Sequence, residues 1–115
     1  MLTPGPAKKV TIYVSEDQQV HGHALYAAIL DFLFHSGVAG ATAVRGIAGF
    51  GAHHKMHTTR ILVLTENLPV KVEFVDSQEK LDEVLPKLKE MVQSGLLTIS
   101  DVEVVKHAPE GGASS

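Results

Sequence analysis

One short segment, residues 46–51, combines closely spaced glycines with neighbouring histidines and is the part of the chain best equipped for ligand chemistry. Its sequence is GIAGFG, and His53, His54 and His57 follow it closely. Because glycine has no Cβ, successive backbone N–H groups can converge on an anion. The spacing matches neither a Walker A loop nor a dinucleotide-binding fingerprint. The residues alone leave two interpretations open: an anion-binding loop, or a mobile hairpin loop that needs positive φ angles.

The histidines of this segment raise the possibility of a metal site. Imidazole binds transition metals well, and His53, His54 and His57 are close enough in sequence to share an ion. No carboxylate or cysteine lies among them, and a flexible loop must be ordered at an entropic cost to bind a metal. Solvated histidines are the second interpretation, and anion contact through protonated histidine and Lys55 is the third.

Catalytic chemistry has little support in the sequence. The chain has no cysteine, which excludes disulfides, thiolate metal sites and a cysteine nucleophile. Acidic residues gather at 76–83, where a helix is expected to begin and where negative charge favours the helix dipole. Arg45 and Glu73 fall within or beside predicted strands, so each needs an ion-pair partner or a ligand. We therefore expect a binding protein and not an enzyme.

Composition limits the partners of this 115-residue chain, which has the length of one domain. A net charge of -3 without basic clusters argues against nucleic acid as a ligand. The most apolar run, residues 24–34, is too short to span a bilayer, and the start of the sequence does not resemble a signal peptide. We expect a cytoplasmic protein.

The elements that carry these residues follow from periodicity. Alternation predicts strands at 9–14, 41–46, 60–65 with 70–75, and 97–105, and helical spacing predicts helices at 24–35 and from 76 to about 95. The order is βαββαβ, which is typical of the ferredoxin-like α+β fold, one antiparallel sheet with both helices on one face. The predicted domain covers residues 8–106, and residues 1–7 and 107–115 are expected to be flexible termini.

Both helices carry features that predict how they pack. The first has two apolar stripes, one with Leu33 and a second with Phe34, which suggests burial against a second subunit as well as against the sheet. In the second, Asp76 and Glu79 form a potential capping box, and Pro86 is expected to produce a kink.

Several stretches of the chain resemble one known family. Residues 40–51 read GATAVRGIAGFG and precede Met56-His57-Thr58, residues 68–76 read LPVKVEFVD, and GLLT and DVEV stand at 95–98 and 101–104. With His21-Gly22 ahead of Leu25-Tyr26, these motifs resemble those of the PII-like proteins of the domain of unknown function 190 (DUF190) family. The resemblance covers residues 9 to 105.

The resemblance implies a function. PII signalling proteins, to which the family is related, are ferredoxin-like homotrimers that bind adenine nucleotides in clefts between subunits. Their long T-loop, between the second and third strands, changes shape with ligand and docks on transporters, channels or enzymes. The resemblance therefore implies a homotrimeric PII-like regulator that binds an adenine nucleotide.

The same resemblance identifies the site. The predicted nucleotide-binding residues are Gly40, Ala41, Thr42, Arg45, Gly49, Phe50, Gly51, Glu73, Phe74 and Val75. Thr42 and residues 73–75 would hold the base, whereas Arg45 and residues 49–51 would approach the ribose or phosphate.

The chain also departs from PII proteins. Residues 94–98 lack the lysine of their phosphate loop, and Lys106-His107 replaces their basic C-terminal segment. Fewer phosphate contacts favour AMP, ADP or a cyclic nucleotide over Mg-ATP. The alternative is a divalent-metal-binding trimer of the CutA type, which shares the fold and would use His53, His54 and His57 as ligands.

Overall fold

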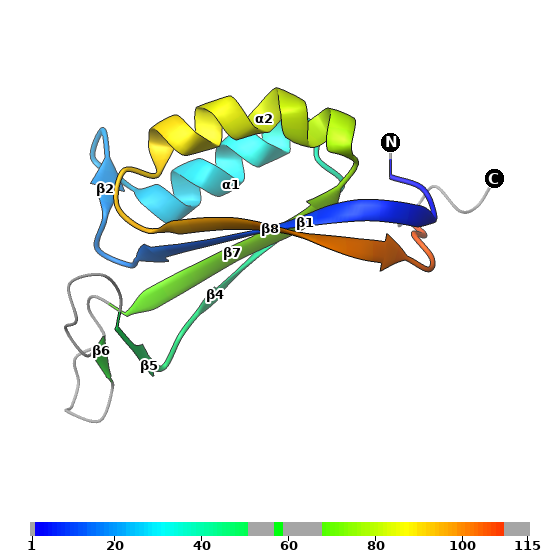
Figure 1. Cartoon of the computed structure of the whole chain (residues 1–115). Helices are drawn as coiled ribbons and strands as arrows, with labels where there is room; N and C mark the ends of the chain where they lie inside the picture. The colour runs from blue at the N-terminus through cyan, green and yellow to red at the C-terminus, as the bar shows by residue number, and fades with distance from the viewer. Residues whose placement is uncertain (1, 51–56, 59–67, 110–115) are drawn as a thin grey trace.

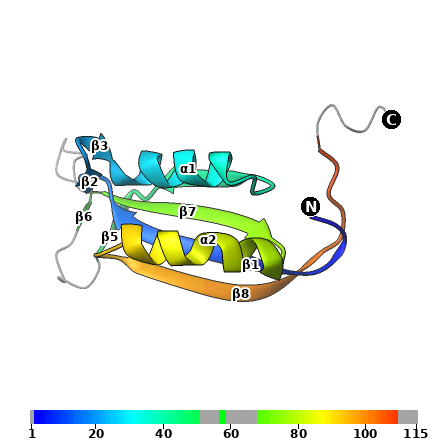
Figure 2. The same ribbon diagram turned by 90° about the horizontal axis from the view of Figure 1, so that it is seen from above.

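The computed structural model describes residues 2–50, 57–58 and 68–109, and these form a sheet with two helices on one face (Figure 1). Figure 2, seen from above, shows the two helices side by side in front of the strands. The elements are β1 (Gly5–Ser15), β2 (Gln19–Val20), β3 (His23–Ala24), α1 (Leu25–His35), β4 (Ala41–Arg45), β5 (Ala48–Gly49), β6 (His57–Thr58), β7 (Pro69–Asp76), α2 (Gln78–Met91) and β8 (Leu96–Val104).

The main sheet has the order β4-β7-β1-β8, and every neighbouring pair is antiparallel. Along the chain its elements run β1-α1-β4-β7-α2-β8, so the predicted ferredoxin-like fold is confirmed. The strand predicted at 60–65 lies outside the described residues. Strands β4 and β8 form the two edges of the sheet, and their outer backbone groups have no partner strand within the described chain.

Alternation along β1 explains why the helices cover one face. Val10 and Ile12 have 0% exposure and Val14 has 4%, and they meet the buried residues of β7 across the ladder. Each helix contributes one buried stripe to this core, as helical spacing predicts. The helix stripes are Leu25, Ile29 and Leu33 in α1 and Leu81, Val84 and Leu88 in α2.

The N-terminal boundary differs from the prediction. Strand β1 begins at Gly5, which pairs with Val104, so the last residues of the expected flexible leader belong to the sheet. These residues form a strand because they pair with β8, and their proline- and glycine-rich sequence does not predict that pairing. Beyond β8, His107 Nδ1 lies 3.2 Å from the Leu2 carbonyl oxygen, so the described ends of the chain contact each other.

The capping box predicted for the second helix is wrong. The N-cap is Ser77, whose hydroxyl accepts a hydrogen bond from the Lys80 N–H at 3.2 Å. Asp76 is instead 2% exposed and accepts hydrogen bonds from the N–H groups of Ala39 at 2.8 Å and Ser77 at 2.7 Å. Its carboxylate therefore ties the segment before β4 to the end of β7. Helix α2 continues through Pro86 to Met91.

Strands β2 and β3 form a small hairpin that the sequence did not predict. Its turn residues, His21 and Gly22, have φ angles of 50° and 81°, as a two-residue hairpin turn requires. The Leu25 N–H donates to the Gln18 carbonyl at 2.8 Å and joins the hairpin to the start of α1. No helix in the described part of the chain is long and apolar enough to cross a bilayer.

Candidate ligand-binding site

Six of the ten predicted binding residues lie on two neighbouring strands, edge strand β4 and its partner β7. Thr42 stands directly opposite Glu73, and Ala41 stands opposite Phe74. The antiparallel register therefore brings residues 40–42 beside residues 73–75, although about thirty positions separate them in the sequence. Sequence alone placed both groups in strands, and the fold makes them neighbours.

The pleat divides this group between the two faces of the sheet. Phe74 is 3% exposed and packs in the core beneath the helices, so its side chain cannot contact a ligand and its predicted role is restricted to backbone atoms. Glu73 and Val75 alternate with it and lie on the opposite, open face. Thr42 shares this face and is exposed.

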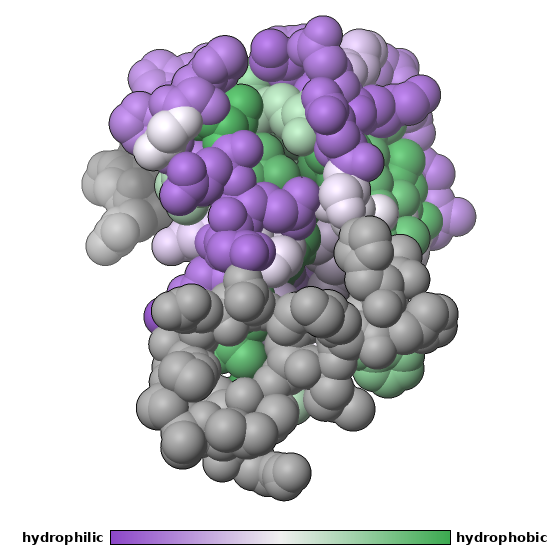
Figure 3. All heavy atoms as spheres, turned by 90° about the vertical axis from the view of Figure 1, so that its left-hand side faces the viewer, coloured by the Kyte–Doolittle hydropathy of each residue, from purple (hydrophilic) through white to green (hydrophobic). Residues whose placement is uncertain are grey.

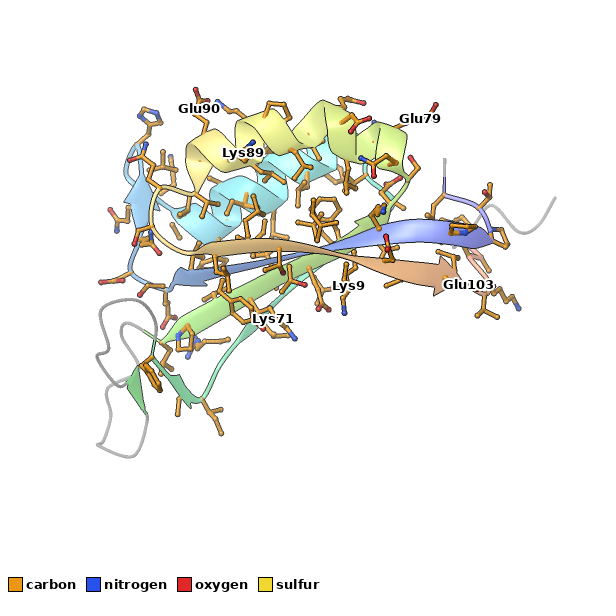
Figure 4. All side chains as sticks on the ribbon, in the orientation of Figure 1. Lys9, Lys71, Glu79, Lys89, Glu90 and Glu103 are labelled. Atoms are coloured by element: carbon orange, nitrogen blue, oxygen red, sulfur yellow. The ribbon has the colours of Figure 1, made fainter. Side chains whose placement is uncertain are left out.

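Two lysines flank Glu73 on the open face. The Nζ atoms of Lys9 and Lys71 each lie 3.8 Å from Glu73 Oε2. Figure 4 shows both lysines projecting from the side of the sheet away from the helices. Glu73 therefore has the ion-pair partners that its position predicted, and the local charge is net positive. Sequence reasoning missed these lysines, although alternation in each strand places them on the same face as Glu73.

Arg45 lies at the other end of β4 and has a separate partner. Its Nε atom is 3.2 Å from Oε2 of Glu16. No role for Glu16 was predicted from the sequence. The next residue, Gly46, donates its N–H to the Pro69 carbonyl at 2.7 Å. Arg45 and Glu73 thus both form ion pairs, each with a different group.

The glycines after β4 are needed for close packing. A Cβ on Gly46 would lie 2.9 Å from Pro69 Cγ, and one on Gly49 would lie 3.3 Å from the same atom. Neither glycine has a positive φ angle, so the hairpin interpretation is wrong on this point for both. Proline at the start of β7 presses against the chain leaving β4, and side chains larger than hydrogen would force the two apart.

The remaining predicted residues lie at or beyond the edge of the described structure. Phe50 is 61% exposed, and Gly51, His53 and His54 lie outside the described residues. His57 belongs to β6, opposite Gly49 in the β5–β6 ladder. The described residues contain no group of three or more metal-ligating side chains. Figure 3 faces this end of the molecule, where hydrophilic residues cover most of the upper described surface, with apolar residues between them.

A hollow of about 470 Å³ lies at the opposite end of the sheet, near the chain termini. It is lined by Leu2, Val75 and residues 102–107. Val75 is the one predicted site residue in this lining, and Lys106 and His107 supply its basic groups. The hollow therefore meets the predicted site at Val75, whereas Arg45 is the last residue of β4 and Gly49 follows it in β5.

Sequence relatives cover almost the whole chain. The DUF190 family model, described as Uncharacterized ACR, matches residues 7–104. A UPF0166 protein of Methanocaldococcus jannaschii is 39% identical over 101 residues, which cover 87% of this chain and 93% of that protein. A UPF0166 protein of Aquifex aeolicus is 36% identical over 98 residues, which cover 85% and 92%.

Solved structures share the fold at lower identity. CPII, a nitrogen regulatory PII-like protein from Thiomonas intermedia bound to ADP, AMP and bicarbonate, gives a TM-score of 0.67 at 20% identity, with 92% of this chain and 94% of that chain covered. CPII bound to ADP, AMP and acetate gives a TM-score of 0.64 at 19% identity, with 91% and 94% covered. The resemblance read from the motifs is confirmed: the chain belongs to the DUF190 family and has the PII-like, ferredoxin-like fold.

Proposed function

We propose that this protein is a cytoplasmic PII-like signalling protein that binds an adenine nucleotide, AMP or ADP, in clefts between the subunits of a homotrimer. The observation that carries the proposal is the β4–β7 register, which sets Thr42 opposite Glu73 on the open face. Proteins of the same fold support it, since CPII is bound to ADP and AMP. Binding, and not catalysis, is the proposed role.

Each part of the site suits one part of a nucleotide. Edge strand β4 offers backbone groups that have no partner strand in the described chain, and these can hydrogen-bond the edge of a base. The Thr42 hydroxyl can both donate and accept, and Val75 supplies an apolar contact. Arg45 is the cation among the proposed binding residues, and guanidinium pairs well with phosphate.

The open face supports the proposed assembly. Tyr13, Val44 and Leu96 are 43%, 49% and 54% exposed and fall in one row across the sheet, interrupted by Lys71. An apolar row on the outside of a single chain marks a contact surface, and a homotrimer built on this face would bury it. The nucleotide would then lie at the edge of that contact, beside β4.

The connection from Arg45 to Pro69 is the proposed signalling segment. The described start of this segment follows directly after β4, so a ligand that contacts Arg45 or Gly49 would contact the segment itself. A ligand changes such a segment only when it interacts differently with two of its conformations. The proposed target is a membrane transporter, a channel or an enzyme.

Calorimetry with AMP, ADP, ATP and cyclic AMP tests the proposal. We expect binding of AMP and ADP, and Thr42→Val should weaken it about tenfold by removing one hydrogen-bonding hydroxyl while keeping the side-chain shape. Thr3→Val is the control, since Thr3 is an exposed threonine that precedes β1 and is not among the proposed binding residues. No heat at millimolar nucleotide, with the trimer intact, would reject nucleotide binding.

A further inference from the structure

Three segments of the chain meet at the base of the connection between β4 and β7. The Glu16 N–H, just after β1, donates to the Leu68 carbonyl at 2.8 Å. The Gly46 N–H, just after β4, donates to the Pro69 carbonyl at 2.7 Å. The backbone around β7 therefore accepts one hydrogen bond from each side, and the Arg45–Glu16 ion pair spans the same junction through side chains.

The two partners of this ion pair differ in exposure. The Glu16 side chain is 23% exposed and the Arg45 side chain is 54% exposed, so solvent and solutes reach the arginine more easily. The contact joins Arg45 Nε to Glu16 Oε2. Glu16 Oε1 is buried and has no hydrogen-bond partner among the described residues. One carboxylate oxygen thus holds the guanidinium, and the other lacks a donor.

The single contact between Arg45 and Glu16 is weaker than the two-bond pairing that a guanidinium and a carboxylate can form. A guanidinium binds a carboxylate or phosphate best through two parallel hydrogen bonds. A buried polar atom without a partner lowers the stability of the arrangement that contains it. Arg45 is therefore held in place by Glu16 while remaining available to an anion that offers more oxygen atoms.

We propose that Glu16 is a positioning residue that holds Arg45 at the base of the signalling segment until a ligand phosphate takes over the guanidinium. This inference rests on the proposed function and adds the way in which the site responds to ligand charge. Without phosphate, the ion pair links the ends of β1 and β4 across β7. With phosphate bound, Arg45 turns to the ligand, and the link between β1 and β4 opens beside the Gly46–Pro69 hydrogen bond.

The first test compares AMP with adenosine, which lacks the phosphate. Glu16→Gln keeps the side-chain shape and removes the competing charge, so AMP should bind about two- to fivefold more tightly, the range expected for a partly exposed ion pair. Adenosine affinity should stay unchanged, which a merely structural effect of the substitution would not produce. Glu90→Gln, in the Lys87–Glu90 pair on α2, is the matched control and should alter neither affinity. Unchanged or weaker AMP binding by Glu16→Gln would overturn the competition.

The second test needs no nucleotide. Hydrogen exchange of the Gly46 amide should accelerate in Glu16→Gln and in Arg45→Gln, and the double variant should show no further acceleration, because both single changes remove the same pair. Exchange that neither substitution alters would overturn the link between β1 and β4. If the wild type binds no AMP, the proposed function and the competition both fail, whereas AMP binding with no response to Glu16→Gln removes this inference alone.

Discussion

The two faces of the sheet are built from alternate residues of the same strands and have opposite relations to the rest of the chain. On the covered face, Val10 and Ile12 are fully buried beneath α1 and α2. On the open face of the same strand, Tyr13 remains 43% exposed, and Lys9 reaches Glu73 at 3.8 Å. Figure 4 shows the contrast, with crowded side chains between the sheet and helices and the labelled Lys9 and Lys71 on the other side.

The two faces differ in whether their side chains find packing partners within the described chain. The covered face has its packing partners within the described chain, so its residues account for folding. The open face and the β4 edge carry hydroxyls, charges and an apolar row that the described chain leaves uncovered. The proposed ligand and the proposed neighbouring subunits both use this second surface.

The largest effect is expected on the covered face. Ile12→Ala removes a fully buried side chain and should lower the free energy of unfolding by about 2–5 kcal/mol, because it leaves a cavity between sheet and helices. Thr11→Ala, at a half-buried position on the open face of the same strand, should lower it by about 1 kcal/mol or less. Urea denaturation of both variants measures the contrast, and equal losses would show that the open face is packed as tightly as the core.

Asp76 is the charged exception on the covered side. Asp76→Ala removes the acceptor for the Ala39 and Ser77 N–H groups and should lower the free energy of unfolding by about 1–3 kcal/mol. Asp82→Ala, an exposed position on α2, should remain within about 0.5 kcal/mol of the wild type. Thermal unfolding compares the two, and matching midpoints would mean that water replaces the carboxylate without loss.

The smallest effect on the fold is expected on the open face, where the consequence should appear in assembly. Tyr13→Lys adds charge to an exposed position and should change the stability of the single chain by about 0.5 kcal/mol or less. In the proposed trimer the same charge would be buried, so light scattering should report dissociation. Ala27→Lys, exposed on α1, should leave the assembly intact. A trimer that tolerates Tyr13→Lys would place the contact elsewhere.

Much of the fold could be read from periodicity. Alternating apolar residues identify the strands at 9–14 and 70–75 and the side of each that is buried. The Leu81-to-Leu88 stripe does the same for the second helix, because a strand buried on one side repeats every two residues and a helix about every 3.6. The capping residue of α2 was misassigned by one position, because Asp76 and Ser77 can both cap. The short β2–β3 hairpin was missed, since two-residue strands carry almost no periodic signal.

The candidate site was predictable in part. The motifs identified Thr42, Arg45 and Glu73 as residues of interest, and the family and fold implied by them are confirmed. The nucleotide, the trimer and the binding roles stay predictions. The partners of these residues depend on register, and a one-residue slip would move every side chain to the other face.

The sequence by itself determined which residues form the core, which family the chain belongs to and which polar groups needed partners, since composition and spacing are local properties. The tertiary structure alone decided that Glu73 lies between Lys9 and Lys71 and that Arg45 binds Glu16. Those outcomes depend on which strands pair and in what register. Strand pairing and register result from packing the whole sheet against two helices, and no short segment of the sequence encodes either.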